Sequence, residues 1–336
     1  MAVPFLATNP APATTGGGAL VGIARLAATS SRLLAKRRVE YFSLSTRSLL
    51  NRCSSPRMPF LWTINPYRGC EFGCKYCYAR YTHEFLELKE PAAFEEKIYS
   101  KEKAGGILRS ELCQNPGGAI AIGTATDPYQ PAERWFGTTR GILETLVEFR
   151  GLELSITTKS DLVTRDISLL REIGQFNALQ VNITITTLHA ELARRLEPRA
   201  PRPDLRLDAV ATLARSAIPV AVFAMPVLPG ITDAPEQLEA IAKAAARAGA
   251  RYFAASVLFL KPAAQRSFFP YLEEHFPELA RGYRRLYCNR AYLRSEVSQR
   301  MERLARRLRQ QYGLRGPQTP RPLTSFGLRN QLSLFH

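Results

Sequence analysis

Short apolar runs alternate with helical patterns between residues 58 and 262, and this alternation leaves few folds open to the chain. Each run is short enough for one strand; the runs are LWTINPY, AIAIGT, LELSITTK, LQVNITITT, PVAVFAMPV and YFAASVLFL. Parallel neighbours in a sheet need a crossover between them, so strands that alternate with helices predict a parallel α/β sheet. We expect an open or partial (β/α)6 barrel rather than a flat doubly wound sheet.

Three cysteines follow the first of these runs. The segment NPYRGCEFGCKYCYAR, residues 65–80, places Cys70, Cys74 and Cys77 within eight positions. The first run ends just before Cys70, so we expect the thiols on the loop that leaves the first strand. Ligands of parallel α/β folds gather at the carboxyl ends of the strands. The sequence therefore predicts a ligand site around these three thiols.

The number of cysteines limits what this site can hold. Thiolates select zinc, copper(I) or iron–sulfur clusters. A structural zinc site is normally closed by four protein ligands, and His83 is the nearest spare candidate. Electron-transfer [4Fe–4S] clusters also generally take four cysteines. Three cysteines would leave one iron free for a substrate or cosubstrate, and we favour this interpretation over zinc.

The spacing C-x-x-x-C-x-x-C, with Tyr76 before the last cysteine, resembles the signature of the radical S-adenosylmethionine superfamily. Four more segments, in order, resemble the group related to spore photoproduct lyase; they are GTATDPYQPAE, TTKS, LEPRAPRPDLRLDAV and MPVLPGITD. The resemblance implies a barrel that holds a [4Fe–4S] cluster on the three cysteines and binds S-adenosylmethionine. It also implies a reductase, flavodoxin or ferredoxin as electron donor, and a 5′-deoxyadenosyl radical as the reactive species.

The resemblance implies cosubstrate contacts at several strand ends. Lys159, in TTKS, matches a lysine that contacts the cosubstrate carboxylate, and Thr186 matches a hydroxyl-bearing residue. Gly123 and Thr124 match the segment that approaches the cosubstrate amino group, and Tyr76 is expected at the same site. Structural roles are the alternative, because glycine also suits a tight strand exit and threonine favours strands.

Tyr78, Asp127 and Tyr129 are the candidates for catalytic residues. Tyr76 and Tyr78 match tyrosines beside the last cluster cysteine of the lyase group. Asp127 and Tyr129 follow the second run, where they would contact cosubstrate or substrate, or cap the next helix. Thr124 stands where the lyase has the cysteine that returns hydrogen to its substrate. A threonine hydroxyl is a poor hydrogen-atom donor, so the resemblance does not extend to thymine-dimer repair by the lyase's own route.

The charge balance bears on the substrate. Lysine and arginine outnumber aspartate and glutamate by 46 to 29, which gives a formal net charge of +17. Such a chain suits a polyanionic partner, here DNA or a nucleotide. We expect a radical enzyme of DNA repair or modification; the alternative is a non-catalytic iron–sulfur or zinc module that binds nucleic acid. The Arg-rich segment 281–313 carries Tyr283, Tyr287 and Tyr292, which would stack on bases or pack against the barrel.

Composition divides the chain into four parts: a partly disordered N-terminal extension, the radical core, a helical segment and a flexible tail, at residues 1–57, 58–262, 263–315 and 316–336. A transit peptide is the alternative for the low-complexity start. No apolar stretch approaches the roughly 18 residues of a membrane span. The remaining cysteines are scattered, unlike a secreted disulfide framework. We therefore expect a soluble, cytoplasmic protein without a membrane partner.

The chain ends in RNQLSLFH, after a Pro-rich stretch. Its residues Gln331, Leu332, Leu334 and Phe335 resemble the motif by which bacterial replication and repair proteins dock on the DNA sliding clamp. Large apolar residues in an exposed tail usually mark a docking site. A tail that folds back onto the chain's own barrel is the alternative.

Overall fold

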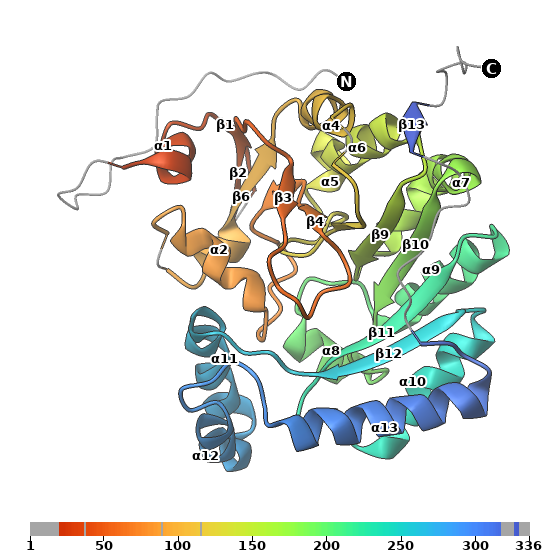
Figure 1. Ribbon diagram of the computed structural model, residues 1–336. Helices are drawn as coiled ribbons and strands as arrows, with labels where there is room; N and C mark the ends of the chain where they lie inside the picture. The colour runs from red at the N-terminus through yellow and green to blue at the C-terminus, as the bar shows by residue number, and fades with distance from the viewer. Residues whose placement is uncertain (1–19, 37, 89, 115, 317–325, 329–336) are drawn as a thin grey trace.

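The computed structural model describes residues 20–36, 38–88, 90–114, 116–316 and 326–328 (Figure 1). Its main sheet has seven strands, in the spatial order β12 (Tyr252–Val257), β11 (Val220–Val227), β10 (Ala178–Thr184), β9 (Glu153–Thr158), β7 (Ile120–Ile122), β4 (Trp62–Ile64) and β3 (Leu50–Arg52). The first six are parallel, and β3 is antiparallel to β4. Each predicted apolar run overlaps one of the six parallel strands.

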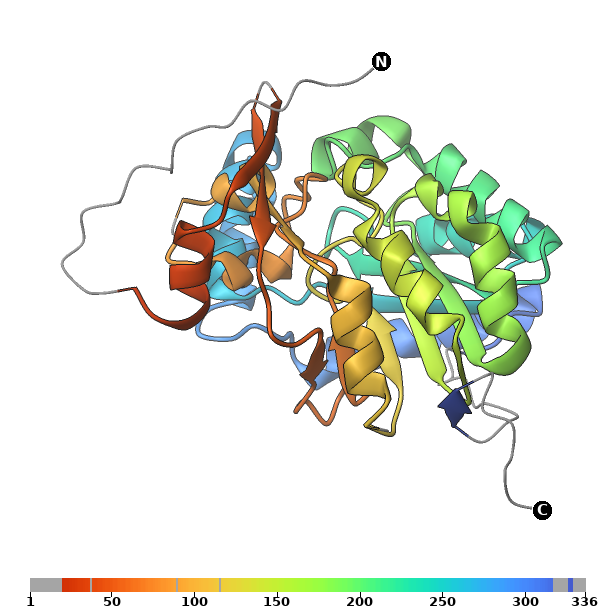
Figure 2. The same ribbon diagram turned by 90° about the horizontal axis from the view of Figure 1, so that it is seen from above.

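The parallel strands follow one another along the sheet in chain order. A doubly wound sheet instead reverses its strand order at a switch point. Within the described residues the edge strands β3 and β12 are not paired with each other, so the curved sheet stays open on one side (Figures 1 and 2). The expected partial (β/α)6 barrel is confirmed.

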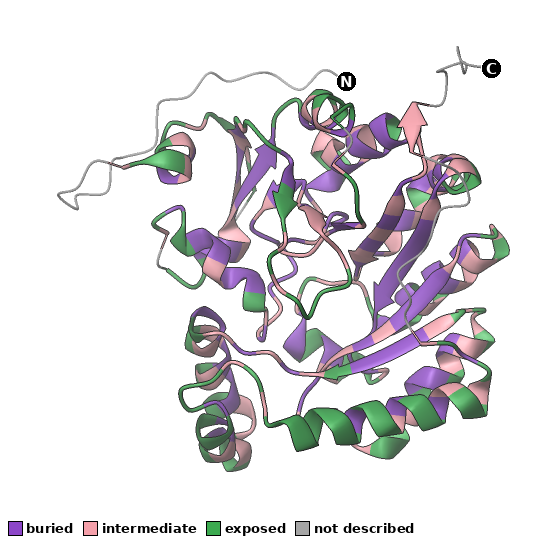
Figure 3. Ribbon diagram, in the orientation of Figure 1, coloured by how far each residue is buried: buried purple, intermediate pink, exposed green. Residues whose placement is uncertain are grey.

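Helices cover the convex face of this sheet (Figure 2). They are α4 (Ala104–Leu112), α6 (Thr138–Leu146), α7 (Ile167–Phe176), α9 (Pro203–Arg215), α10 (Pro235–Arg247) and α13 (Ser295–Tyr312). Side chains alternate across a strand, so Leu154 and Ile156 of β9 join the buried core under the helices, whereas Ser155 and Thr157 face the concave side. Figure 3 shows the central strands of this sheet as deeply buried. The interior of the barrel is therefore more polar than its helical side.

Short helices complete the loops that leave the strands. They are η1 (Tyr78–Arg80), α2 (Tyr81–Glu84), α3 (Ala93–Glu96), α5 (Glu133–Phe136), η2 (Asp161–Asp166) and α8 (Ala190–Leu196). Of these, η1 follows the cysteines directly, and α8 follows β10. Both lie at the carboxyl edge of the sheet, where the sequence predicts the ligand site.

Part of the N-terminal extension belongs to the folded structure. After α1 (Gly22–Ala28), a second sheet has the order β1 (Arg32–Lys36), β2 (Val39–Leu44), β6 (Lys97–Lys101) and β5 (Tyr67–Arg68). Tyr41 and Leu44 of β2 are fully buried, and β3 lies in the main sheet. The domain boundary at residue 57 stays a prediction. Short strands that pair with distant partners leave little local pattern, so the sequence did not indicate the strands before it.

The C-terminal segment is helical, as expected, with α11 (Pro262–His275) and α12 (Pro277–Leu286) before α13. Tyr283 and Tyr287 are buried, and each hydroxyl donates a hydrogen bond of 2.7 Å to a backbone carbonyl. Their suggested stacking on bases is wrong, because packing against the barrel leaves their ring faces covered. Tyr292 is 44% exposed.

Near the chain end, β13 (Gly327–Leu328) pairs with β8 (Phe149–Arg150). The clamp-like residues Gln331, Leu332, Leu334 and Phe335 lie outside the described residues. Among the described residues, no helix has both the length and the apolar character that crossing a bilayer requires.

Candidate functional site

Cys70, Cys74 and Cys77 lie on one loop between β5 and η1. Cys70 is buried, the other two are partly buried, and all three pack in an apolar cluster with Phe72 and Phe94. Burial raises the pKa of each thiol, to about 12 for Cys74. Because a thiol binds metal as the thiolate, metal binding must release these protons.

Backbone hydrogen bonds fix this cysteine loop from two sides. The amide of Cys70 donates to the carbonyl of Phe94 at 2.9 Å, next to the second sheet. The amide of Lys75 donates to the carbonyl of Leu196, at the end of α8, also at 2.9 Å. Gly69 has a φ of +78°, and a Cβ there would lie 2.8 Å from two carbonyl oxygens. These contacts give the loop a defined conformation.

Arg80, which follows the three cysteines in the sequence, stabilises the same loop. Its buried guanidinium donates to the carbonyl of Cys74 at 3.1 Å and forms an ion pair of 2.7 Å with Glu95. The cation also lies over the ring of Phe94, 5.6 Å from its centroid. These contacts satisfy a charge that would be costly to bury alone, and they hold the turn between Cys74 and Cys77.

Gln130 joins the cysteine loop to the loop after β7. It is completely buried; its amide nitrogen donates to the carbonyl of Gly69 at 3.0 Å, and its oxygen accepts from the amide of Glu71 at 2.9 Å. The buried carboxylate of Glu71 accepts in turn from Tyr41 of the N-terminal strand β2, at 2.8 Å. Sequence reasoning missed all three residues, because nothing in the local pattern marks a polar side chain as buried.

A buried charge network lies on the other side of the cysteine loop. The carboxylate of Glu197 pairs with the guanidinium of Arg206 at 2.5 Å and accepts hydrogen bonds from the hydroxyls of Tyr76 and Thr186. Burial alone would raise the pKa of Glu197, but Arg206 and Lys159 lower it below its ordinary value. Tyr76 and Thr186, both predicted at the cosubstrate site, are thus brought together by two residues that the sequence did not identify.

Lys159 directly follows β9 and directs its ammonium toward this network. The nitrogen lies 5.8 Å from the centroid of the Tyr76 ring, and it forms no ion pair with any described carboxylate. Burial alone would lower the pKa of Lys159, but Cys74 and Glu197 raise it. A charged ammonium beside a cysteine suits an anionic ligand.

Gly123 and Thr124 follow β7 and approach the same loop. Gly123 has a φ of +90°, and a Cβ there would lie 2.5 Å from the carbonyl oxygen of Thr157. The side chain of Asn65 donates to the Thr124 hydroxyl at 3.2 Å, and the hydroxyl of Tyr78 donates to the Thr124 carbonyl. Only glycine allows this close passage of the chain, which brings Thr124 next to the tyrosine that follows Cys77.

Asp127, on the loop after β7, connects that loop by hydrogen bonds to the end of β9. One carboxylate oxygen accepts from the Thr158 hydroxyl at 2.6 Å and from the Tyr129 amide at 2.9 Å, and the other accepts from the Lys159 amide at 2.7 Å. Burial raises the pKa of Asp127 despite these bonds. The contacts position Lys159, so they favour a structural role, and the catalytic role predicted for Asp127 stays a prediction.

Tyr129 and His83 lie in packed surroundings. Tyr129 is 1% exposed and belongs to the main hydrophobic core, so its predicted catalytic role also stays a prediction. The His83 ring packs against Phe94 and Tyr99, and its Nε2 contacts the carbonyl of Lys97 at 3.0 Å. Within the described part of the chain, no three His, Cys, Asp or Glu side chains surround a point where a single metal ion could bind.

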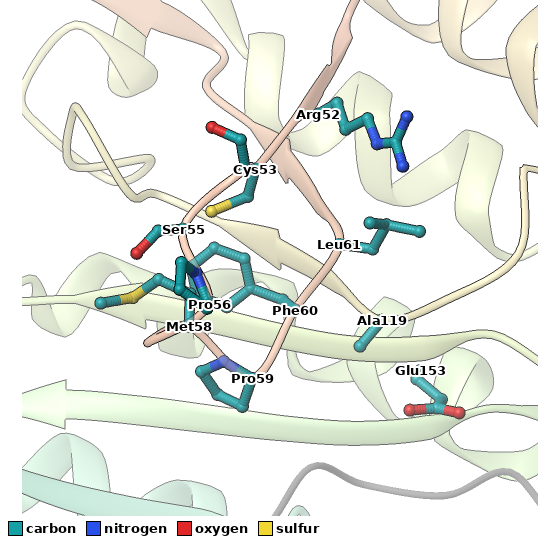
Figure 4. A pocket seen from close by; sticks show the side chains of 11 residues that line it. Arg52, Cys53, Ser55, Pro56, Met58, Pro59, Phe60, Leu61, Ala119 and Glu153 are labelled. Atoms are coloured by element: carbon teal, nitrogen blue, oxygen red, sulfur yellow. The ribbon is translucent and has the colours of Figure 1, made fainter.

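A pocket elsewhere on the barrel is separate from this site (Figure 4). Arg52 at the end of β3 and residues 53–56 and 58–61 of the loop between β3 and β4 line it, together with Ala119 and Glu153. Ala119 precedes β7 and Glu153 begins β9, so the pocket opens at the amino ends of the strands. The cysteines lie at the carboxyl ends, where parallel sheets bind their ligands.

The residues at the carboxyl edge fit an iron–sulfur cluster with an open position. Three soft thiols occupy one fixed loop, in the water-poor setting of Phe72 and Phe94. The nearby cation Lys159 suits a ligand that carries a carboxylate. This arrangement agrees with the donor set expected from the spacing of the cysteines.

The sequence model of the Radical SAM superfamily matches residues 64–253, and the chain belongs to that superfamily. An uncharacterized protein of Mycobacterium tuberculosis is 32% identical over 310 residues, which cover 91% of each chain. Another, of Methanocaldococcus jannaschii, is 30% identical over 241 residues, which cover 72% of this chain and 85% of the relative. These relatives share most of the chain, including the segment outside the matched family region.

Solved structures of spore photoproduct lyase have the same fold. The lyase complexed with dinucleoside spore photoproduct gives a TM-score of 0.60 at 16% identity, over 89% of this chain and 84% of the lyase. A lyase variant with bound AdoMet and the dinucleoside gives 0.60 at 15% identity, over 90% and 85%. The resemblance noted in the sequence is thereby confirmed at the level of superfamily and fold.

Proposed function

We propose that this chain is a radical enzyme that holds a [4Fe–4S] cluster through Cys70, Cys74 and Cys77 and binds S-adenosylmethionine beside it. The observation that supports this most is the position of Lys159, whose ammonium lies next to Cys74 at the carboxyl edge of the barrel and forms no ion pair with a described carboxylate. When bound and reduced by a flavodoxin, ferredoxin or reductase, the cluster supplies one electron that cleaves the cosubstrate to methionine and a 5′-deoxyadenosyl radical.

Residues of this chain would orient the cosubstrate. The Lys159 ammonium binds its carboxylate by a charge-assisted contact. The backbone at Gly123 and Thr124 approaches its amino group, because the glycine lets the chain pass close to the cysteine loop. Tyr76 and Thr186 are held by Glu197 and shape the wall next to Lys159. Water is excluded by the apolar packing around the thiols.

Tyr78, Asp127 and Tyr129 are proposed to serve the reaction. Tyr78 is the best placed of the three, since it is 38% exposed and its hydroxyl is already directed to the Thr124 carbonyl. Asp127 would act by holding Lys159 in place. Because Thr124 cannot return a hydrogen atom as a cysteine can, the reaction would differ from the lyase's own in its last step.

The proposed substrate is DNA or a nucleotide, in a repair or modification reaction. The formal net charge of +17 suits a polyanion. A protein of the same fold, spore photoproduct lyase, has been solved with a dinucleoside spore photoproduct. The polar concave face of the barrel, where Asn182 bonds Thr157 at 3.1 Å, offers hydrogen-bonding groups to such a ligand.

The test is product analysis on anaerobically reconstituted protein. Reduced protein should release 5′-deoxyadenosine and methionine from S-adenosylmethionine, slowly without substrate, and chromatography measures both. Replacement of Cys70, Cys74 and Cys77 by alanine should abolish the products and the bound iron and sulfide. The matched control replaces the exposed cysteines Cys113 and Cys288 by alanine and should keep both. A full cluster in the first variant would refute the assignment of the ligands.

We also propose that Gln331, Leu332, Leu334 and Phe335 dock the enzyme on a DNA sliding clamp. In such docking the glutamine makes polar contacts, and Leu334 and Phe335 fill an apolar pocket. A labelled peptide of residues 326–336 should bind the clamp of the same source saturably at tens of micromolar or tighter. The same peptide with alanine at 334 and 335 is the control, and equal binding of both peptides would refute the proposal.

A further inference from the structure

The helix α13 presents a basic surface to solvent. Its residues Met301, Ala305 and Leu308 are buried in the main core, so they fix the side of the helix that faces the barrel. Four exposed arginines lie within eight positions of the same helix, and we call them the α13 basic face; they are Arg300, Arg303, Arg306 and Arg307. At about 3.6 residues per turn, these arginines fall on the side away from the buried residues. Figure 3 shows exposed residues along the outer side of α13.

The charge of the α13 basic face is not neutralised within the described part of the chain. No ion pair joins any of its four arginines to a described carboxylate. The helix itself carries two glutamates, Glu296 and Glu302, and Glu302 forms an ion pair of 2.7 Å with Arg309, which is not part of the face. The face therefore keeps an excess of positive charge.

The neighbouring helix α10 extends this positive surface. The two helices pack side by side, and Glu239 of α10 accepts hydrogen bonds from Gln311 and Tyr312 of α13 at 2.9 Å and 2.7 Å. Lys243 and Arg247 follow Glu239 at intervals of four residues, so they lie on the same side of α10, and both are exposed. Two more cations thus flank the arginines, and the carboxylate between the helices is already hydrogen-bonded.

The α13 basic face consists of polar groups. The exposed side chains between its arginines include Gln299 and Gln310, and the one exposed large apolar residue described on α13 is Val297, near the helix start. A helix that lies in a lipid surface inserts an apolar side, but the apolar side of α13 is buried against the barrel. The face therefore suits a ligand that is recognised by charge and hydrogen bonds, and guanidinium groups match phosphates in both respects.

One end of α13 lies near the candidate radical site. Tyr292 comes just before the helix, and its ring centroid is 4.3 Å from that of Phe259, which is 5.7 Å from that of Tyr78, the residue after Cys77. From there α13 runs along β12, and the chain after it reaches the start of that strand, where Arg315 forms a bridge with Tyr252 (Figure 1). A long ligand on α13 would therefore extend from the cysteine side of the barrel.

We propose that the α13 basic face binds the phosphate backbone of duplex DNA. The proposal rests on the proposed function, because it names the form in which DNA reaches the radical site. A duplex carries one negative charge per about 1.7 Å of its axis, a higher density than a single strand has. Proteins hold single strands largely by stacking bases on aromatic rings, and the α13 basic face contains no ring. Binding through this face therefore favours a duplex and is independent of base sequence.

The experiment uses cluster-loaded protein, kept anaerobic, and a fluorescein-labelled DNA duplex of mixed sequence. Anisotropy measures Kd at several salt concentrations, and the labelled single strand is measured in parallel. Wild-type protein should bind the duplex more tightly. The double variant Arg303→Gln, Arg306→Gln should bind the duplex about tenfold or more weakly at low salt, because it removes two phosphate contacts. Its slope of log Kd against log salt should be smaller by about 1.8, at about 0.9 per contact.

The matched control is the double variant Arg171→Gln, Arg215→Gln. It removes the same two charges from exposed positions of α7 and α9. Glutamine forms helices nearly as well as arginine, so both double variants should keep the fold, which circular dichroism checks. The control should bind the duplex like the wild type. An equal loss in both variants would mean that binding follows the net charge of the chain, and it would overturn the inference.

The outcomes separate this inference from the proposed function. Cleavage of S-adenosylmethionine by wild-type protein without saturable duplex binding would overturn the inference and leave the radical chemistry. Duplex binding that depends on Arg303 and Arg306, in protein that cannot cleave the cosubstrate, would support the inference and refute the proposed function. Tighter binding of the single strand, of anionic lipid vesicles or of a polyglutamate peptide than of the duplex would also overturn the inference.

Discussion

Glu197 and Arg206 form an ion pair of 2.5 Å in which neither side chain is more than 1% exposed. The pair connects the end of α8 to α9, and the same carboxylate accepts hydrogen bonds from Tyr76 and Thr186. Two residues assigned to the cosubstrate site from the sequence therefore depend on a buried charge for their positions. The pair also places a negative charge near the ammonium of Lys159 and favours its charged form.

Glu197→Gln should destabilise the protein by about 3–5 kcal/mol, because it leaves the buried guanidinium of Arg206 without its counter-charge. Chemical denaturation of cluster-free protein measures the effect. Asp204→Asn is the matched control: Arg202 and Asp204 are also 2.5 Å apart, but their side chains are 59% and 55% exposed. The control should not change stability measurably. Equal losses in both variants would show that burial of the pair does not determine its contribution.

Gly123→Ala should destabilise the protein by about 1–3 kcal/mol from its left-handed φ alone, and the contact with the Thr157 carbonyl adds to this. Gly106→Ala is the control, since a Cβ in this helical position of α4 meets nothing within 4 Å. That variant should gain about 0.5–1 kcal/mol. Thermal or chemical unfolding compares the two. A loss in Gly106→Ala, or none in Gly123→Ala, would contradict the close passage at the end of β7.

Protonation of His83 should make the cluster-free protein less stable in acid. Burial lowers the pKa of His83 from 6.5 to about 4 in the folded state. Between these two values the unfolded chain binds more protons than the folded one, so the free energy of unfolding falls as the pH drops from 6.5 toward 4. The loss from this group is roughly 3 kcal/mol by pH 4, at 1.36 kcal/mol per pKa unit.

His83→Phe keeps a ring against Phe94 and Tyr99 and removes the titrating group. Its stability should therefore fall less steeply than that of the wild type between pH 6.5 and 4, although it loses the contact with the Lys97 carbonyl at all pH values. Urea denaturation at several pH values measures both curves. Parallel curves for the two proteins would mean that His83 does not titrate in this range.

Lys159→Met should weaken the binding of S-adenosylmethionine by about 1.5–3 kcal/mol, because it removes a charge-assisted contact and keeps most of the side-chain volume. Isothermal titration of cluster-loaded protein measures the affinity. Lys243→Met, on the exposed side of α10, controls for the loss of one positive charge from the chain. An affinity equal to that of the control would return Lys159 to an ordinary position at a strand end.

The barrel was predictable from sequence because buried parallel strands form continuous apolar runs. Each run overlaps a strand, from Trp62–Ile64 to Tyr252–Val257. The position of the cysteines at the carboxyl edge of the sheet follows from the same pattern, since Cys70 comes soon after the first strand. The family signature then added the cosubstrate residues, which local patterns alone do not distinguish from ordinary strand ends.

Glu197, Arg206 and Gln130 could not be found in this way. Charged and amide side chains are usually exposed, so their burial depends on partners that the fold supplies. Gln130 bonds a residue 59 positions away, and Glu197 bonds one 121 positions away. The strand Val39–Leu44 was missed for a related reason, because its parallel partner is Lys97–Lys101. Long-range pairing of this kind leaves no period in the sequence.

Electron paramagnetic resonance of the reduced, cluster-loaded protein tests the central claim most directly. If Cys70, Cys74 and Cys77 hold a [4Fe–4S] cluster with one open iron, the spectrum should change on addition of S-adenosylmethionine, because the cosubstrate becomes a ligand of that iron. The change should need higher concentrations in Lys159→Met. A [4Fe–4S] spectrum that stays the same at saturating cosubstrate would mean a cluster closed by a fourth ligand, and would contradict the account.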